Sequence, residues 1–437
     1  MARALILTVI FALLALAGAA GCSKEESGPV RFLVFGDPEE LAAYRTLVDA
    51  YEKEEPGADV QLVEASDRSD LIARLSTSIA GGSPPDLFLM NYRFYGQFAA
   101  KDAIEPIEAR LEETDAFRAD DFYPQALEAF RWGGEQLCLP QNISSLVVYF
   151  NRDLFHRFRV PEPRSGWTWT EFVAKAGLLT RDAQGRVALG GDPDTGGVRP
   201  VSYGLGVEPT LIRIAPSVWS NGGELVDNER RPTRLTLDTP EARQALQAFL
   251  DLRAQGVVPT DEEVEAEDDE SRFANGRLGM LLSSRRSTPT FRTITEFEWD
   301  VAPLPRHLRL AGILHSDAYC MTAASSRKDD AWRFVEFALG SEGQRIVART
   351  GRTVPSLISI SRSEAFLDPS QPPRNARVFL DAIPTIRRLP LISTWPEIED
   401  ATGGVLENGL YLGQPLDQVI RELDRVTRPL FARAETP

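Results

Sequence analysis

The sequence predicts an α/β protein in which strands and helices alternate to form layers. Short apolar runs alternate along the chain with stretches of helical spacing, and the first elements follow the order strand, helix, strand, helix, strand. The 437 residues are 43% hydrophobic and 26% charged, which is typical of a folded chain long enough for two domains.

The first strand is predicted over residues 31–35 (RFLVF), and residues 39–55 then place apolar side chains on one helical face. The next strand is 59–63 (DVQLV), followed by a second helix over 69–79. The third strand, 86–90 (DLFLM), has no polar alternation, as expected for a strand covered on both faces. In a doubly wound sheet of this kind, the loops after the strands' carboxyl ends face the ligand crevice.

A polar and aromatic cluster follows the third strand directly: Asn91, Tyr92, Arg93, Phe94 and Tyr95. Its position predicts that it lies at the crevice wall. Aromatic faces stack on the apolar faces of sugar rings, while Arg and Asn reach ring hydroxyls. We interpret the cluster as a sugar-binding wall. The alternative is that Phe94 and Tyr95 pack over the following helix.

The N-terminus has the features of an export signal over residues 1–21, with a charge at Arg3 and an apolar run too short to span a membrane comfortably. The ending AAGC resembles a bacterial lipobox, although Ala19 stands where Leu is usual. We expect Cys22 to be lipidated and residues 22–29 to form a polar tether. Ordinary signal cleavage is the alternative.

The net charge of −16 argues against nucleic acid or an anionic lipid surface as a partner. The acidic run at 261–270 (DEEVEAEDDE) lacks the ligand spacing of a calcium loop and predicts a solvated surface. GxSxG, HExxH, CxxC and phosphate-loop motifs are absent, and His156, His307 and His315 lack metal-ligand spacing. We therefore expect no catalytic residue, metal or cofactor.

A set of motifs extends over almost the whole chain after the signal. It consists of PPDLFLMNYRFYGQFAAKDAIEPI (84–107), LPQNISSLVVYFNRDLF (139–155), GWTWTEFVAKAGLLTRDAQGR (166–186), NGGELVD (221–227), NGRLGMLL (275–282), WDVAPLP (299–305), SDAYCMTAASSRKDDAWRFVEFALGSEGQ (316–344) and ISTWPEI (392–398). The ordered set resembles extracellular solute-binding protein family 1, the carbohydrate-binding lipoproteins of ABC importers.

The resemblance implies a two-lobed periplasmic-binding-protein fold (type II), with a ligand cleft between lobes joined by crossing strands. Each lobe would be discontinuous: residues 30–140 and 317–357 in the first, and 141–316 and 358–437 in the second. Cys138 and Cys320 fall beside the first two crossings. In an exported protein they could form a disulfide, and buried free thiols are the alternative.

Carried over position by position, the resemblance implies these ligand-binding residues: Asp37, Arg68, Asn91, Tyr92, Arg93, Tyr95, Asn142, Glu208, Arg213, Trp219, Arg285, Arg286, Asp317 and Trp395. Core packing is the alternative for Trp219 and Trp395, whereas Trp167 and Trp169 are expected to pack at a helix start. The family frequently offers an aromatic platform where Arg285 and Arg286 stand. The Gly- and Pro-rich loop 190–200 is expected to be surface decoration, or else to close over a larger ligand.

The expected function is capture of a neutral mono- or oligosaccharide by closure of the lobes, for delivery by a monomer in the bacterial cell envelope to an ABC permease with its ATPase. Arginines 93, 213, 285 and 286 raise an acidic saccharide or sugar phosphate as an alternative. However, only five of the 48 basic residues are Lys, so arginines enter any pocket by composition. An exported glycan-active enzyme and a ligand-free scaffold are the further alternatives.

Overall fold

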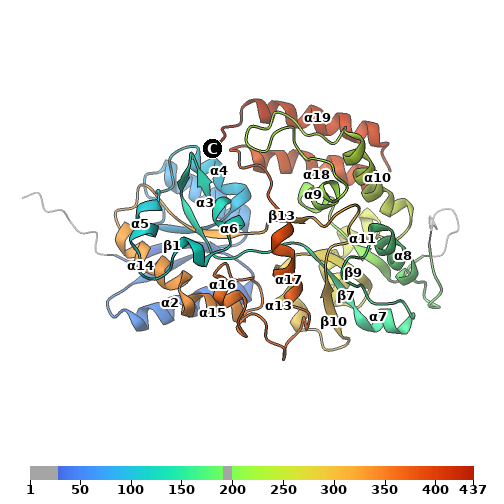
Figure 1. The fold of residues 1–437 in the computed structure, drawn as a ribbon, viewed down its shortest axis with the longest axis horizontal. Coiled ribbons are helices and arrows are strands. Elements are labelled where there is room, and N and C mark those ends of the chain that lie inside the picture. The colour runs from blue at the N-terminus through green and yellow to red at the C-terminus, as the bar shows by residue number, and fades with distance from the viewer. Residues whose placement is uncertain (1–27, 190–198) are drawn as a thin grey trace, which may run out of the picture.

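The computed structural model describes residues 28–189 and 199–437, which form two α/β lobes with a helical layer across the top of the view (Figure 1). The expected export signal, Cys22 and most of the tether lie outside the described residues, as does nearly all of the loop at 190–200. Among the described residues, no helix is both long and apolar enough to span a membrane.

The first lobe is built on a five-stranded sheet in the order β2-β1-β3-β12-β6. The strands are β1 (Val30–Phe35), β2 (Val60–Ala65), β3 (Leu87–Asn91), β6 (Cys138–Pro140) and β12 (Asp317–Met321). β1 runs parallel to β2 and β3, and β12 runs antiparallel to β3 and β6. The carboxyl ends of β1, β2, β3 and β6 therefore share one edge with the first residue of β12. The three strands predicted from the apolar runs are confirmed.

Helices cover both faces of this sheet, as the apolar strands predicted. Phe32 packs with α2 (Pro38–Glu54), α14 (Lys328–Leu339) and α15 (Ser341–Arg349), whereas its neighbour Leu33 packs with α3 (Arg68–Ala80) and α4 (Tyr92–Ala99). Successive side chains of a strand point to opposite faces, so one run of apolar residues contributes side chains to two cores. The short elements α5 (Glu108–Glu113), η1 (Ala119–Asp121), α6 (Pro124–Glu128), β4 (Arg131–Trp132), β5 (Glu135–Gln136) and α16 (Ile358–Ser361) complete the lobe.

The second lobe contains a four-stranded sheet in the order β10-β7-β9-β8. Its strands are β7 (Val147–Asn151), β8 (Tyr203–Gly206), β9 (Leu278–Ser283) and β10 (Trp299–Ala302), and its helices are α7 (Arg152–Arg157), α8 (Trp169–Leu179), α9 (Leu211–Ser220), α10 (Pro240–Ala254), α11 (Asp261–Ala266), α12 (Asp269–Ala274), η3 (Arg285–Ser287) and α13 (Thr288–Arg292). β8 and β9 are parallel, so their carboxyl ends lie at one edge. α8 approaches β8 so closely that a Cβ on Gly204 would lie 1.8 Å from the Ala176 carbonyl oxygen.

The C-terminal segment bridges the two lobes. It comprises α17 (Arg377–Ala382), η4 (Ile383–Thr385), β13 (Ile386–Arg387), α18 (Trp395–Tyr411) and α19 (Leu416–Ala432), and β13 pairs with β11 (Gly312–Ile313). α18 packs on α19 and on α9 and α10 of the second lobe, and it also contacts α4 of the first lobe (Figure 1). The helical layer is therefore in a position to link movement of one lobe to the other.

Three backbone segments lie side by side at the boundary between the lobes. The Ser144 amide donates to the His315 carbonyl (2.8 Å), the Ile143 amide donates to the Val354 carbonyl (2.9 Å), and the Ser356 amide donates to Gln141 (3.2 Å). The residues after the third segment, 354–356, stay with the first lobe, because Leu357 and Ile360 belong to its core. The chain therefore leaves the first lobe later than the expected boundary at residue 357.

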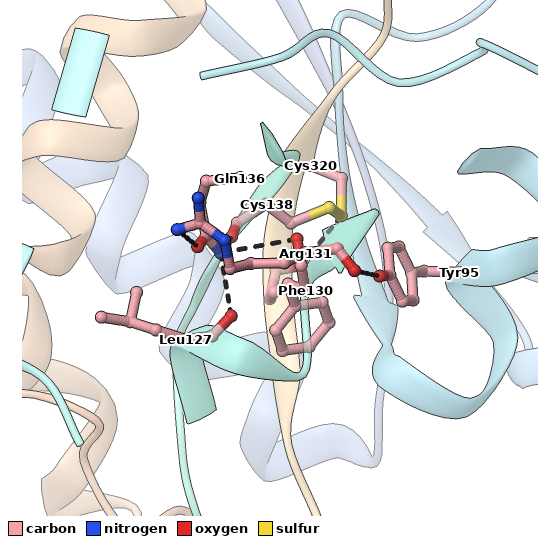
Figure 2. Close-up of a disulfide and its surroundings, with 8 residues drawn as sticks. Tyr95, Leu127, Phe130, Arg131, Gln136, Cys138 and Cys320 are labelled. Carbon is pink, nitrogen blue, oxygen red and sulfur yellow. Dashed lines mark hydrogen bonds between the residues drawn. A yellow bond between two sulfur atoms is a disulfide. The ribbon is translucent and has the colours of Figure 1, made fainter. Parts of the chain in front are cut away.

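A disulfide joins Cys138 to Cys320 directly before the first crossing and within β12 (Figure 2). The two residues face each other in the β6–β12 ladder with a Cα–Cα separation of 4.5 Å, within the range that a disulfide spans. Gln136 also fixes this edge strand, because its amide donates to the carbonyls of Leu127 (3.0 Å) and Cys138 (2.8 Å). The sheet edge next to the crossing is thus held covalently and by hydrogen bonds.

Candidate functional site

Polar side chains of the first lobe gather where the carboxyl ends of its strands share one edge. Asp37 follows β1, Arg68 opens the helix after β2, Asn91 ends β3, Asn142 follows β6 and Asp317 begins β12. All five were predicted as ligand-binding residues. The sheet order brings them to one edge of the sheet although they come from distant parts of the chain.

Asp317 is oriented by two asparagines at this edge. Asn91 Nδ2 donates to Asp317 Oδ1 (3.1 Å), and Asn142 Nδ2 donates to Oδ2 (3.3 Å). The Asp317 backbone amide donates in return to Asn142 Oδ1 (3.1 Å). Within the described chain, no cationic side chain forms an ion pair with Asp317, so its carboxylate keeps unused acceptor capacity.

Arg68 is held by aromatic rings rather than by an acidic partner. Its guanidinium carbon lies 5.2 Å from the centre of the Phe35 ring and 5.1 Å from that of Phe94. Burial, together with the charge of Arg93, lowers the pKa of Arg68 to about 10, and Asp317 acts in the opposite direction. In the described part of the chain, its Nε is buried without a hydrogen-bond partner.

Arg93 connects the first lobe to the C-terminal helices. Its Nη1 lies 2.5 Å from Oε2 of Glu399 on α18, and Trp395 Nε1 donates to the other oxygen of Glu399 (2.8 Å). Burial alone would lower the pKa of Arg93, but Glu399 and other partners raise it overall. Glu399 therefore neutralises a nearly buried cation at the junction of the lobes.

The second lobe contributes a wall of paired charges after β8 and β9. Arg213, on α9, is 5% exposed, and its Nη2 lies 2.9 Å from Glu208 Oε2. Arg286, after β9, lies 3.2 Å from Glu270 and 3.9 Å from the other oxygen of Glu208. The charge of Arg213 is the main cause of the lowered pKa of Glu208, so this carboxylate stays ionised.

The two walls act on each other electrostatically. Arg93 of the first lobe helps to lower the pKa of Glu208 in the second. Burial lowers the pKa of His315, on the crossing segment, well below its usual value, and Arg213, Arg93, Arg68 and Arg286 lower it further. His315 is therefore neutral, and the charges of arginines from both lobes act on it.

A hollow of about 940 Å³ opens beside the second-lobe wall. Glu208 and Arg286 line it together with Asp269, Glu270 and Tyr411. This volume is in the range of small-molecule sites. The acidic run at 261–270, which contributes Asp269 and Glu270, forms α11 and the start of α12, and in the described chain no cluster of His, Cys, Asp or Glu is arranged to hold a metal ion.

Four of the predicted aromatic contacts do not offer a ring face in this structure. Tyr92, Tyr95, Trp219 and Trp395 are each at most 2% exposed. The Tyr92 hydroxyl accepts from a backbone amide, and the Tyr95 hydroxyl donates to the Arg131 carbonyl (2.7 Å; Figure 2). The packing alternative therefore holds for Tyr95, Trp219 and Trp395, and Tyr92 is buried in the same way.

Arg285 also differs from its predicted place. It is 1% exposed, its guanidinium stacks between Phe366 and Phe379, and its Nε donates to the Gly351 carbonyl (2.5 Å). Only Arg286 of the expected basic pair faces the site. Asp37 lies at the margin, where it pairs with Arg352 and caps α2 by accepting from the Glu40 amide (2.9 Å).

Sequence reasoning missed two residues of the site. Glu399 lies four residues after Trp395, one helical turn further along α18, so its place could have been inferred once that helix was predicted. His315 directly precedes the predicted crossing strand, and its neighbouring residues give no local signal of a binding role. Trp167 and Trp169 pack at the start of α8, as expected, where Trp167 Nε1 donates to the Pro303 carbonyl (2.9 Å).

Comparison with known proteins gives concordant matches. Residues 36–345 match the sequence model of the bacterial extracellular solute-binding proteins. A protein of Brucella abortus (strain 2308), described as a binding protein, is 24% identical over 94% of each chain, and the maltotriose-binding protein of Pyrococcus abyssi is 24% identical over 69% of this chain and 60% of its own.

Solved structures share the fold over nearly the whole chain. The ABC substrate-binding protein of Listeria monocytogenes in complex with cycloalternan has a TM-score of 0.81 at 23% identity, covering 92% of this chain and 98% of its own. UgpB of Mycobacterium tuberculosis in complex with glycerophosphocholine has a TM-score of 0.78 at 20% identity, covering 93% and 99%. Because their ligands differ in chemistry, the fold does not decide which ligand class this site takes.

Proposed function

The chain belongs to the bacterial extracellular solute-binding protein family, and we propose on this premise that it captures an uncharged saccharide between its lobes for an ABC importer. The maltotriose-binding relative and the cycloalternan complex favour a saccharide. The glycerophosphocholine complex makes a ligand with a phosphate group the alternative, and the charges of the site decide between them.

The observation that carries the proposal is the charge balance of the junction. Arg93 pairs with Glu399, Arg213 with Glu208, and Arg286 with Glu270. Arg68 shares its sheet edge with Asp317, whose charge acts against the effect of burial on the pKa of Arg68. Each cation therefore has an anion close by, and a bound anion would gain little from the arginines while meeting four carboxylates.

The same groups suit hydroxyls. A sugar hydroxyl both donates and accepts, so it can bridge a carboxylate and a guanidinium, and hydrogen bonds to charged groups are stronger than neutral ones. We place the contacts at Arg68, Asn91, Arg93, Asn142, Glu208, Arg213, Arg286 and Asp317. The hollow of about 940 Å³ beside Glu208 gives room for more than one ring.

Binding would proceed by closure of the lobes around the ligand. Contacts come from both lobes, so a ligand that touches both walls stabilises the closed arrangement by its differential affinity for it. The closed form would present the outer faces of both lobes to a permease, whose separate ATPase supplies the energy. In this scheme the protein is a monomeric binder and carries out no chemistry.

We also propose that the protein is exported to the cell envelope and anchored by a lipid on Cys22. The sequence before Cys22 supports this, and residues 22–29 would then tether the lobes near the permease. Mass spectrometry of the purified N-terminal peptide tests the anchor directly. An unmodified Cys22 in protein from a membrane fraction would contradict it.

A thermal-unfolding screen of the form that starts after Cys22 tests the ligand class. Tagatose, maltose and maltotriose are the neutral probes, and glucuronate and glucose 6-phosphate are the anionic ones. A ligand at about 100 times its dissociation constant adds about 2.7 kcal/mol to the stability of the folded state. We expect a shift with a neutral saccharide. Shifts with the anionic probes alone would refute the charge argument.

A further inference from the structure

We propose that Arg68 selects the ligand: its guanidinium, clamped between Phe35 and Phe94, works with Asp317 to bind two neighbouring hydroxyls of one saccharide. This inference rests on the proposed function and names the chemistry that the site recognises. It would make Arg68 and Asp317 the specificity-determining pair of the first lobe.

The clamp fixes the position of the guanidinium before any ligand arrives. Phe35 ends β1 and Phe94 belongs to α4, so two different elements hold the same planar group at 5.2 and 5.1 Å. The backbone at Arg68 is fixed as well, because Asp67 caps α3 by accepting from the Asp70 amide (2.9 Å). A donor that is already ordered loses little entropy on binding.

Arg68 differs from the other arginines of the site in having no polar partner among the described residues. Arg93, Arg213 and Arg286 each have a carboxylate within 3.2 Å. Asp317 is also without a cationic partner, although its charge reaches Arg68 and raises the pKa of that residue against the effect of burial. The site therefore keeps one strong donor and one strong acceptor at the same edge of the sheet without joining them.

A pair of neighbouring hydroxyls matches this arrangement better than an anion does. One hydroxyl can accept from the planar fork of Arg68 while its neighbour donates to the Asp317 carboxylate. A carboxylate or phosphate only accepts, so it could satisfy Arg68 but would be repelled by Asp317 and by Glu399, whose charge also reaches Arg68. The pair thus favours a vicinal diol.

Arg285 shows that an aromatic clamp alone does not make a binding residue. Its guanidinium also lies between two phenylalanines, at 4.8 Å from Phe366 and 5.0 Å from Phe379. However, it is 1% exposed and donates to the Gly351 carbonyl, so its hydrogen-bonding capacity serves the fold. What distinguishes Arg68 is the clamp together with unused donors at the ligand-facing edge.

The test compares affinities by titration calorimetry on the full chain, first with tagatose, maltose and maltotriose. Arg68→Met and Arg68→Lys are each expected to weaken the tightest of these by about 10- to 100-fold, because a hydrogen bond to a charged group is lost or loses its planar geometry. The matched control is Arg74→Met, on the same helix, whose partner is Asp70 on the exposed surface (2.8 Å). It should leave the affinity unchanged.

Monodeoxy analogues of the same saccharide locate the hydroxyls. Removing the hydroxyl that binds Arg68 should weaken wild-type binding about tenfold and have little further effect in Arg68→Met, whereas other hydroxyl deletions should be additive. Asp317→Asn should show the same non-additivity with the adjacent hydroxyl. The melting temperature without ligand checks that each variant is folded.

Affinity of folded Arg68→Met within twofold of wild type, or additivity at every hydroxyl, overturns the inference while the proposed function stands. Tighter binding of glucuronate or glucose 6-phosphate than of any neutral probe by wild type, lost in Arg68→Met, overturns the choice of a diol. If wild type binds no saccharide, the proposed function fails and the inference falls with it.

Discussion

Glu399→Gln is the sharpest test of the charge balance that the proposal uses. The substitution keeps the size of the side chain and removes the negative charge that faces Arg93. The pair is nearly buried, with side-chain exposures of 10% for Arg93 and 17% for Glu399. Trp395 also donates to Glu399, so the carboxylate is held in place before it meets Arg93.

The expected loss of folding stability is about 3 kcal/mol. Removing one partner from a buried ion pair costs about 3 to 5 kcal/mol because the remaining charge is left uncompensated. The residual exposure of this pair places it at the lower end of that range. A matched control is Glu422→Gln, whose partner Arg425 is 69% exposed, and its loss should be much smaller because solvent screens an exposed pair.

Urea unfolding of both variants measures the two losses, and calorimetry with glucuronate measures the second consequence. Without the carboxylate of Glu399, the net charge of the junction is one unit more positive. The affinity for glucuronate, relative to that for a neutral saccharide, should therefore be higher in the variant than in wild type. A loss for Glu399→Gln as small as that for Glu422→Gln would refute the energetic argument. Unchanged discrimination against glucuronate would refute the argument that paired carboxylates exclude anions.

Three further predictions address the disulfide, the pH dependence of stability and the role of Arg285. Reduction of Cys138–Cys320 should lower the free energy of global unfolding by up to about 5 kcal/mol, because the bond closes 182 residues, and equal urea midpoints with and without reductant would contradict this. The pKa of Glu208 is lowered, so its stabilising contribution is present above its usual pKa of 4.5 and is lost as pH falls through the folded pKa. Glu208→Gln should therefore make the free energy of unfolding fall less steeply with acidification. An unchanged dependence on acid pH would argue against this. Arg285→Met should shift the melting temperature but leave saccharide affinity unchanged. A loss of affinity in the folded variant would indicate that Arg285 contributes to ligand binding after all.

Much of the first lobe could be predicted because its signals are local. Apolar runs define β1, which Gly36 and Pro38 follow, and β3, which Pro84 and Pro85 precede, and a polar residue directly after such a strand must lie at the carboxyl edge. The position of Asn91 at the site could be predicted for this reason. The parallel sheet then brings in Arg68 from the loop after β2.

The aromatic residues were harder because position after a strand does not say which way a helix turns. Tyr92, Tyr95 and Ala99 follow the i, i+3, i+7 spacing of a buried helical face, and Phe94 falls outside that stripe. This spacing could have shown that Phe94, and not Tyr95, points toward the site. The aromatic partners of Arg285 lie more than 80 residues later in the chain, so no local pattern could have placed it.

The contrast between paired and unpaired charges explains which kind of ligand the junction favours. Arg93, Arg213 and Arg286 form ion pairs with neighbouring carboxylates, so they contribute ordered hydrogen-bonding groups without a net attraction for anions. Arg68 and Asp317 lie at the same sheet edge with no ion pair between them, so a neutral ligand that both accepts and donates hydrogen bonds can satisfy both. A site that merely attracted charge would need no clamp around Arg68 and no two asparagines behind Asp317. The presence of both indicates that geometry, more than net charge, decides what the lobes close upon.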